Sequence, residues 1–200
     1  MYIVKRRKNR NQDTFQMVAD YVKQGKTVLI GGTLGSGKTT LLKELLSFTG
    51  DDKVVAVGWD VEMTGITCSN VTVRDKQDDN IPQDIVKAVE NGEAIRLAYD
   101  NVRGESIVSA MKMWEGTGKG LGTVVTTSME MLIHCLLLRD MEMKKATREE
   151  ATERFVKTFD ILVFMGYKHK DIQEIVEVDK QVTNEVRVLP VAKAVEINWE

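Results

Sequence analysis

The segment Gly32-Thr-Leu-Gly-Ser-Gly-Lys-Thr39 constrains this chain more than any other part of its sequence. Its spacing is GxxxxGK[ST], and its context fits that string. The short apolar run Val28-Leu-Ile30 precedes it and has the character of a buried strand, while leucines from Leu41 to Leu46 give the following segment the stripe of an amphipathic helix. A strand, a glycine-rich turn and a helix in this order predict a P-loop.

Such a loop binds a polyphosphate through its backbone. The glycines let successive N–H groups point inward, and the positive end of the following helix dipole attracts the anion. Lys38 is expected to reach the β- and γ-phosphates, and the Thr39 hydroxyl to take one position around Mg²⁺. We therefore predict a nucleoside triphosphate and Mg²⁺ as ligands. The predicted nucleotide-binding residues are Gly32, Gly35, Ser36, Gly37, Lys38, Thr39 and Thr40.

Composition excludes several other classes of protein. The chain has 28 Lys and Arg against 30 Asp and Glu among 200 residues, so it does not bind nucleic acid through overall positive charge, although a local basic patch stays open. Cys68 and Cys135 lie far apart and only two histidines are present, which argues against a structural zinc site and favours a reducing compartment. The sequence holds no run of 18 uncharged apolar residues. A cytoplasmic protein is expected.

The pattern along the chain predicts one α/β domain over residues 14–200, preceded by a basic arm over residues 1–13. The arm is either a solvated tail or a basic patch that faces a membrane surface or an acidic partner. Strands alternate with helices, which predicts a mainly parallel sheet covered on both faces, and the last three strands are expected to form an antiparallel extension. The expected strands are 28–30, 53–57, 71–74, 94–99, 123–126, 161–165, 172–178 and 185–189.

Two further segments carry a resemblance to a known family. Arg96-Leu-Ala-Tyr-Asp-Asn-Val-Arg-Gly-Glu105 is followed by Ala110-Met111 and then by Gly120-Leu-Gly-Thr-Val-Val-Thr-Thr-Ser128. Together with the P-loop, this order resembles the secretion traffic ATPases, the hexameric motors of type II and type IV secretion, pilus assembly and conjugation. The resemblance implies a RecA-like P-loop fold, ATP as the nucleotide and a homo-oligomer, specifically a hexamer.

The sequence departs from that family at several positions. The family's Walker B glutamate falls on Asn101, and the histidine of its His box falls on Val125. In the acidic box the first two carboxylates fall on Gly58 and Trp59, which leaves Glu62 as the matched residue. The 13 leading residues offer no counterpart to the family's N-terminal domain. These departures leave the rate of hydrolysis open.

The predicted catalytic residues are Glu62, Asp100 and Arg103. Glu62 would orient the attacking water, or it is a surface carboxylate. Asp100 would hold Mg²⁺ together with Thr39, or it caps the following helix. Arg103 would position the site, or it forms a structural ion pair. Arg74 is a weaker candidate for action on a neighbouring subunit, because a solvated or paired arginine explains it as well.

Three functions stay open at this point. The first is a motor domain that couples ATP binding and hydrolysis to protein or DNA transport, with partners among inner-membrane secretion, pilus or conjugation components and no sequence-specific nucleic-acid contact. The second is a degenerate nucleotide-binding regulatory subunit with little or no hydrolysis. The third is a small-molecule kinase, which would need an arginine-rich lid, whereas the candidate segment 139–154 is acidic and helical. A place in the cytoplasm, at the inner membrane face, goes with the first function.

Overall fold

One eight-stranded sheet organises the chain. The computed structural model describes residues 2–76, 83–167, 171–181 and 186–193. The strand order is β3-β2-β4-β5-β1-β6-β7-β8, with β1 to β6 parallel and β7 and β8 antiparallel. The strands are β1 (Val28–Gly32), β2 (Lys53–Gly58), β3 (Val71–Asp75), β4 (Ile95–Tyr99), β5 (Gly120–Val125), β6 (Ile161–Met165), β7 (Ile172–Val178) and β8 (Val188–Lys193).

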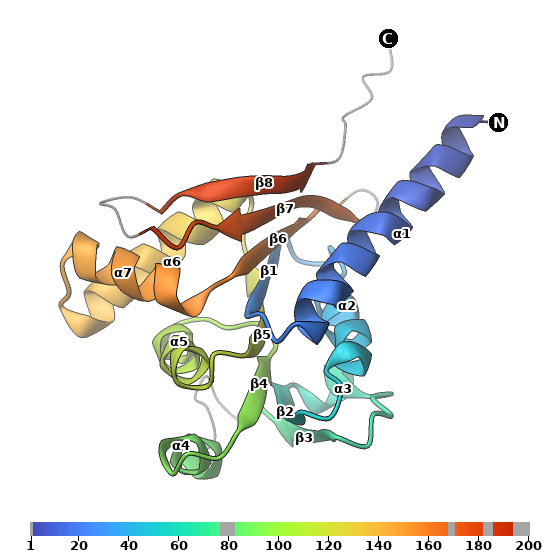
Figure 1. Cartoon of the computed structure of the whole chain (residues 1–200). Coiled ribbons are helices and arrows are strands. Elements are labelled where there is room, and N and C mark those ends of the chain that lie inside the picture. The colour runs from blue at the N-terminus through green and yellow to red at the C-terminus, as the bar shows by residue number, and fades with distance from the viewer. Residues whose placement is uncertain (1, 77–82, 168–170, 182–185, 194–200) are drawn as a thin grey trace.

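Helices cover both faces of the sheet (Figure 1), with α1, α2 and α3 on one side and α4 to α7 on the other. The described helices are α1 (Tyr2–Lys23), α2 (Lys38–Leu45), a 3₁₀ turn η1 (Leu46–Phe48), α3 (Asp60–Met63), α4 (Gln83–Glu90), α5 (Glu105–Thr117), α6 (Met129–Lys144) and α7 (Arg148–Thr158). The predicted α/β architecture with a mainly parallel sheet is confirmed.

Alternation along each strand separates two cores. In β1, Val28 and Ile30 pack with α1 and α2, whereas Leu29 packs with the helices of the other face. Because successive strand residues point to opposite faces, a strand buried on both sides reads as a continuous apolar run. This explains why β1 and β2 were recognisable without any alternation of apolar and polar residues.

Several boundaries differ from the expectations. Helix α1 begins at Tyr2 rather than near Thr14, so the expected arm falls within the first part of this helix, and the side chains of residues 1–12 lie outside the described part. Strand β6 runs parallel to β1, so only β7 and β8 form the antiparallel extension. Strand β8 begins at Val188, and residues 182–185 lie outside the described part.

The glycines around the start of β5 serve two purposes. Gly118 ends α5 in the left-handed conformation, at φ 65°, as a helix stop should. Gly120 and Gly122 instead belong to the strand, because the Trp114 indole lies against them: a Cβ at Gly122 would be 2.5 Å from Trp114 Cη2. The indole is itself fixed, since its Nε1–H donates to the Leu97 carbonyl at 3.0 Å.

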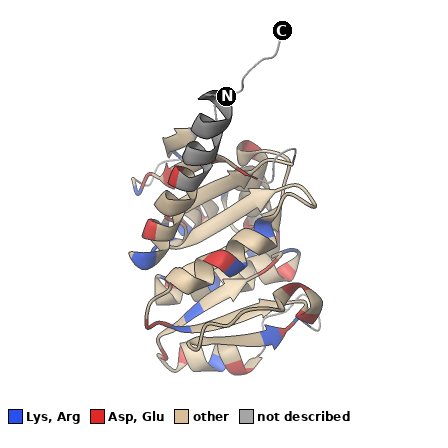
Figure 2. Cartoon of the chain, turned by 90° about the vertical axis from the view of Figure 1, so that its right-hand side faces the viewer, with Lys and Arg blue, Asp and Glu red and all other residues tan. Residues whose placement is uncertain are grey.

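Charges of both signs are dispersed over the face that carries α2 and α3 (Figure 2). None of the helices in the described ranges is long and apolar enough to cross a membrane. The polar groups of functional interest gather instead at the carboxyl ends of β1, β4 and β5, where ligands bind in open α/β sheets.

Candidate nucleotide site

The P-loop connects β1 to α2 and leaves its backbone donors available. Gly35 and Gly37 have φ angles of 74° and 91°, in the left-handed region that favours glycine. Gly37 caps α2 and has no side chain that could accept from the N–H groups of the first turn. Those groups have no partner within the helix, so they remain free to bind an anion, which the helix dipole also attracts.

Gly32 is required for a different reason, close packing. A Cβ there would lie 2.8 Å from the Met165 carbonyl oxygen and 2.6 Å from Ser36 Oγ. A backbone carbonyl on the neighbouring strand cannot move aside as a flexible side chain can. Gly32 therefore lets β1 and β6 stay in register while Ser36 folds beneath the loop.

Lys38 points along the loop and is 7% exposed. Its Nζ donates to the Thr33 carbonyl at 2.7 Å and lies 3.5 Å from Ser36 Oγ. Burial lowers the pKa of Lys38, and the negative charges of Asp100 and Glu62 raise it. A bound polyphosphate would bring further negative charge to this ammonium, which favours the protonated form.

Asp100 links the P-loop to the centre of the sheet. It follows β4 directly and is 1% exposed. The Thr39 hydroxyl lies 3.1 Å from Asp100 Oδ1 and 3.0 Å from Oδ2, and the Thr123 hydroxyl donates to Oδ1 at 2.6 Å. Strand β5, inserted between β1 and β4, supplies Thr123 and so fixes the carboxylate that faces Thr39. A threonine hydroxyl and a carboxylate in contact are the oxygen ligands that Mg²⁺ takes in phosphate sites.

Asn101 continues the turn in the left-handed conformation, with φ 53°. Its N–H donates to Thr123 Oγ1 at 2.7 Å, and its carbonyl accepts from Lys76 Nζ at 2.8 Å. Lys76 is 1% exposed, and its ammonium stands over the Tyr99 ring at 4.9 Å from the centroid. The backbone of Asn101 is thus held on both sides, which keeps Asp100 aimed at the P-loop.

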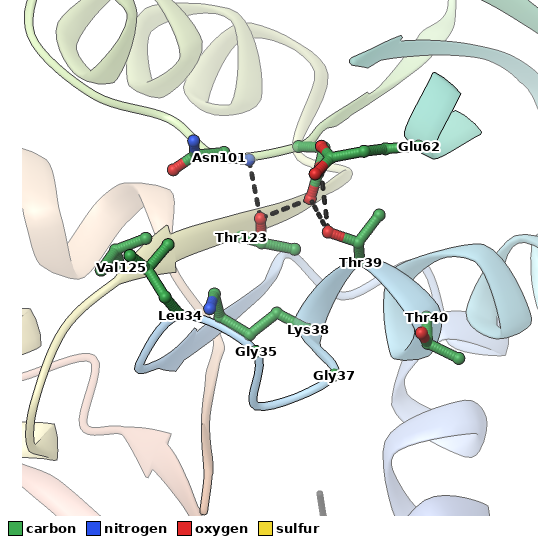
Figure 3. A pocket seen from close by; sticks show the side chains of 11 residues that line it. Leu34, Gly35, Gly37, Lys38, Thr39, Thr40, Glu62, Asn101, Thr123 and Val125 are labelled. Carbon is green, nitrogen blue, oxygen red and sulfur yellow. Dashed lines mark hydrogen bonds between the residues drawn. The ribbon is translucent and has the colours of Figure 1, made fainter. Parts of the chain in front are cut away.

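Glu62 approaches the site from α3 (Figure 3). The residue is exposed, yet its side chain lines the same cavity as Lys38 and Asp100. Burial raises the pKa of Glu62, and the nearby Asp100 carboxylate raises it further, while Lys76 and Lys38 act in the opposite direction. A carboxylate with a raised pKa that faces a phosphate site suits proton transfer.

The residues of the site line an open cavity of about 290 Å³. Its lining residues are Leu34, Gly35, Gly37, Lys38, Thr39, Thr40, Glu62, Asp100, Asn101, Thr123 and Val125. Two other predicted residues, Gly32 and Ser36, are outside this lining: they pack against each other at the base of the loop, and Ser36 Oγ lies 3.5 Å from Lys38 Nζ. Arg103 is not part of this lining. It is exposed, and its N–H and carbonyl both bond to the Ser106 hydroxyl, at 2.9 and 2.7 Å.

Three contributors to the site were not predicted. Thr123 was assigned only to a strand, although its position between β1 and β4 places a hydroxyl at the phosphate-binding edge. Lys76 is a single lysine after a polar strand and carries no local signal in the sequence. Leu34 occupies one of the unspecified positions of the GxxxxGK[ST] pattern, and it is 74% exposed at the loop. Arg74 forms an exposed ion pair with Asp84 at 3.6 Å.

A family model described as "CobW/HypB/UreG, nucleotide-binding domain" matches residues 26–96. The matched range contains β1, the P-loop, α2, β2 and β3, and it ends at the start of β4. It covers less than half of the chain and supports nucleotide binding by the P-loop. No curated protein matches the sequence.

Solved structures extend the likeness to most of the chain. The VirB11 ATPase from the Brucella suis type IV secretion system is 15% identical, with a TM-score of 0.70 over 84% of this chain and 53% of that chain. The chain has the fold of a secretion-ATPase P-loop domain. The Legionella pneumophila ATPase DotB is 16% identical (TM-score 0.50, 84% of this chain, 44% of that one). The pilus retraction motor PilT with bound ADP is 13% identical (TM-score 0.52, 72% and 43%).

The chain therefore spans about half of the VirB11 chain and less than half of the other two. The expected resemblance to secretion ATPases is confirmed at the level of the fold.

Proposed function

We propose that this chain is an ATP-binding motor domain of the secretion-ATPase type, which couples ATP binding and hydrolysis to protein or DNA transport. One observation carries the proposal furthest: the Thr39 hydroxyl lies within 3.1 Å of both oxygens of buried Asp100, beside Lys38 on the P-loop. The P-loop and a buried carboxylate from a distant part of the sequence meet at one cavity. A glycine-rich turn without a ligand would not need that carboxylate.

The residues present fit a bound Mg²⁺. Thr39 and Asp100 would hold it, directly or through its water molecules, because the Thr39 hydroxyl and the Asp100 carboxylate are in contact and both residues line the cavity. The ion would neutralise charge on the terminal phosphates. Lys38 would hold the same phosphates from the loop, and the N–H groups at the start of α2 would bind their oxygens.

Hydrolysis requires a group that orients the attacking water. Glu62 is the proposed residue, because it lines the cavity and because its raised pKa makes the carboxylate a stronger base. Arg103 is exposed at the surface next to β4, so it would act on phosphate charge only after a rearrangement or from one copy of the chain to another.

A second function, a nucleotide-binding regulatory subunit, has its own support. Asn101 and Val125 both line the cavity, at the positions where the secretion ATPases have a glutamate and a histidine. Neither side chain can accept a proton from water as a carboxylate or an imidazole does. If Glu62 does not replace them, the chain binds nucleotide and changes shape without turnover.

Oligomerisation and location belong to the first proposal. We expect a hexamer with nucleotide between subunits, located in the cytoplasm at the inner membrane face and working with secretion, pilus or conjugation components. The support is the shared fold, together with Glu62 and Val125, which line the cavity and are both exposed.

The decisive experiment combines binding and turnover. Calorimetry should give Mg²⁺-dependent ATP binding that Lys38→Ala abolishes, and Lys112→Ala is the matched control, because Lys112 is an exposed lysine paired with Glu90 away from the site. Hydrolysis per subunit should rise with protein concentration. Binding without turnover at any concentration would favour the regulatory subunit, and absence of binding with the fold intact would overturn both functions. Phosphate transfer to a small metabolite would instead revive the kinase.

A further inference from the structure

The described cavity accounts for phosphates and metal but offers no surface for a nucleobase. At about 290 Å³ it is at the lower end of the roughly 300–1,000 Å³ of small-molecule sites. None of the described residues that line it is aromatic. A nucleoside triphosphate bound there must place its base outside this lining.

The positions of the site residues indicate which way a bound triphosphate would run across the sheet. Lys38 and Thr39 begin α2, after the P-loop that follows β1. The groups that would meet the terminal phosphates, Asp100 and Glu62, come from the side of the sheet that holds β4 and β2. A triphosphate whose terminal end faces Asp100 extends its ribose and base away from β4. In the order β4-β5-β1-β6, that direction leads past the P-loop to β6 (Figure 1).

An exposed aromatic ring stands at this place. Strand β6 runs parallel to β1 with Met165 opposite Gly32, and Tyr167 follows two residues later. A Cβ on Gly35 would lie 3.5 Å from Tyr167 Cε2, so the tyrosine ring lies against the P-loop backbone. Tyr167 is nevertheless 67% exposed. A Cβ at position 35 would make only an ordinary van der Waals contact with the ring, and the glycine there is explained by its φ of 74°.

We propose that Tyr167 stacks against the base of the nucleotide whose phosphates occupy the P-loop, an inference that rests on the proposed nucleotide binding. A flat π-face beside the phosphate site suits a purine, and burying an exposed ring against it removes apolar surface from water. Stacking contributes to affinity for every base, because every base has a π-face. The residue thus adds affinity for nucleosides without selecting adenine over guanine.

Leu34 is the other exposed apolar residue at the loop, 74% exposed, and it serves as a contrast. It lines the cavity together with Val125 of β5. Leu34 is therefore on the phosphate side, whereas Tyr167 is on the side of β6. An aliphatic side chain in that position shields the phosphates and cannot stack on a base that lies beyond β1.

The test separates the base from the phosphates. Affinities of ATP, GTP and inorganic tripolyphosphate, each with Mg²⁺, are measured by calorimetry for the unmodified chain, Tyr167→Ala, Tyr167→Phe and Leu189→Ala. Leu189 is an exposed apolar residue on β8, 55% exposed and remote from the loop. We expect Tyr167→Ala to weaken ATP and GTP by about 5- to 100-fold. Tripolyphosphate should be unaffected, and Tyr167→Phe and Leu189→Ala should bind all three ligands normally.

The outcomes distinguish this inference from the proposed function. If the unmodified chain binds neither ATP nor tripolyphosphate, nucleotide binding itself is wrong. If both bind and Tyr167→Ala leaves the ATP affinity unchanged, the stacking role is overturned while the P-loop function stands. Equal losses of ATP and tripolyphosphate in Tyr167→Ala would also overturn it, because the ring would then support the loop rather than the base.

Discussion

Replacing Asn101 by glutamate is the most informative change that the site allows. Asn101 lines the cavity directly after Asp100. The resemblance noted in the sequence places the Walker B glutamate of the secretion ATPases at this position. Its backbone is fixed by hydrogen bonds to Thr123 and Lys76, so a new side chain would start from the same place as the present one. If position 101 can orient water, Asn101→Glu should hydrolyse ATP faster than the unmodified chain.

The expected gain and cost can both be estimated. A positioned general base typically contributes about 10²- to 10⁴-fold to a rate. Asn101 has φ 53°, which asparagine tolerates better than glutamate, so the backbone costs about 1–2 kcal/mol. Repulsion from Asp100 and Glu62 adds roughly 1–3 kcal/mol at an intermediate effective dielectric constant. For a chain of this size, the sum lowers the unfolding midpoint by about 4–20 °C.

The assay is steady-state phosphate release with saturating Mg²⁺ and ATP, beside thermal unfolding of the same samples. Asn101→Gln is the matched control, because it has the length and the backbone cost of glutamate without the charge. We expect Asn101→Glu to exceed Asn101→Gln by at least about 100-fold. Equal rates in two folded, ATP-binding variants would refute the reasoning, and would leave Glu62 as the proposed residue for orienting water.

Three further outcomes follow from the same geometry. Gly122→Ala should lower the free energy of unfolding in urea by about 1–3 kcal/mol or more, because its Cβ would collide with the Trp114 indole. The hydrolysis rate should fall at low pH with a midpoint above the pKa of an ordinary glutamate, because the pKa of Glu62 is raised and only its deprotonated form accepts a proton. Glu62→Gln should remove this pH dependence. Lys76→Met should lower the free energy of unfolding by about 1–3 kcal/mol, because the Asn101 carbonyl loses its donor.

The P-loop could be predicted from sequence because everything it requires is local. The glycines, the lysine and the threonine are contiguous, and the flanking strand and helix have their own apolar patterns. Asp100 was also accessible, as the polar residue that ends an apolar strand. Its contact with Thr39 depends on the strand order, with β5 between β1 and β4, and the residues alone do not give that order.

The parts that sequence reasoning missed depend on distant contacts. Lys76 matters because it reaches from the end of β3 to the Asn101 carbonyl, across β2, and nothing near it in the sequence shows this. Tyr167 matters because β6 pairs with β1. The first turns of α1 and the four-residue helix α3 were missed for a different reason, since polar or short segments give little periodicity.

The residues that would hold the phosphates and the residue that would orient water differ in how firmly the chain fixes them. On the phosphate side the backbone donors, Lys38, Thr39 and Asp100 are fixed by contacts within the chain. On the water side Glu62 is exposed. Because burial raises the pKa of Glu62, a second subunit that covers it would raise that pKa further, toward the pH at which a general base is most effective. Assembly and turnover are then linked through one carboxyl group, and hydrolysis should depend on protein concentration more steeply than ATP binding does.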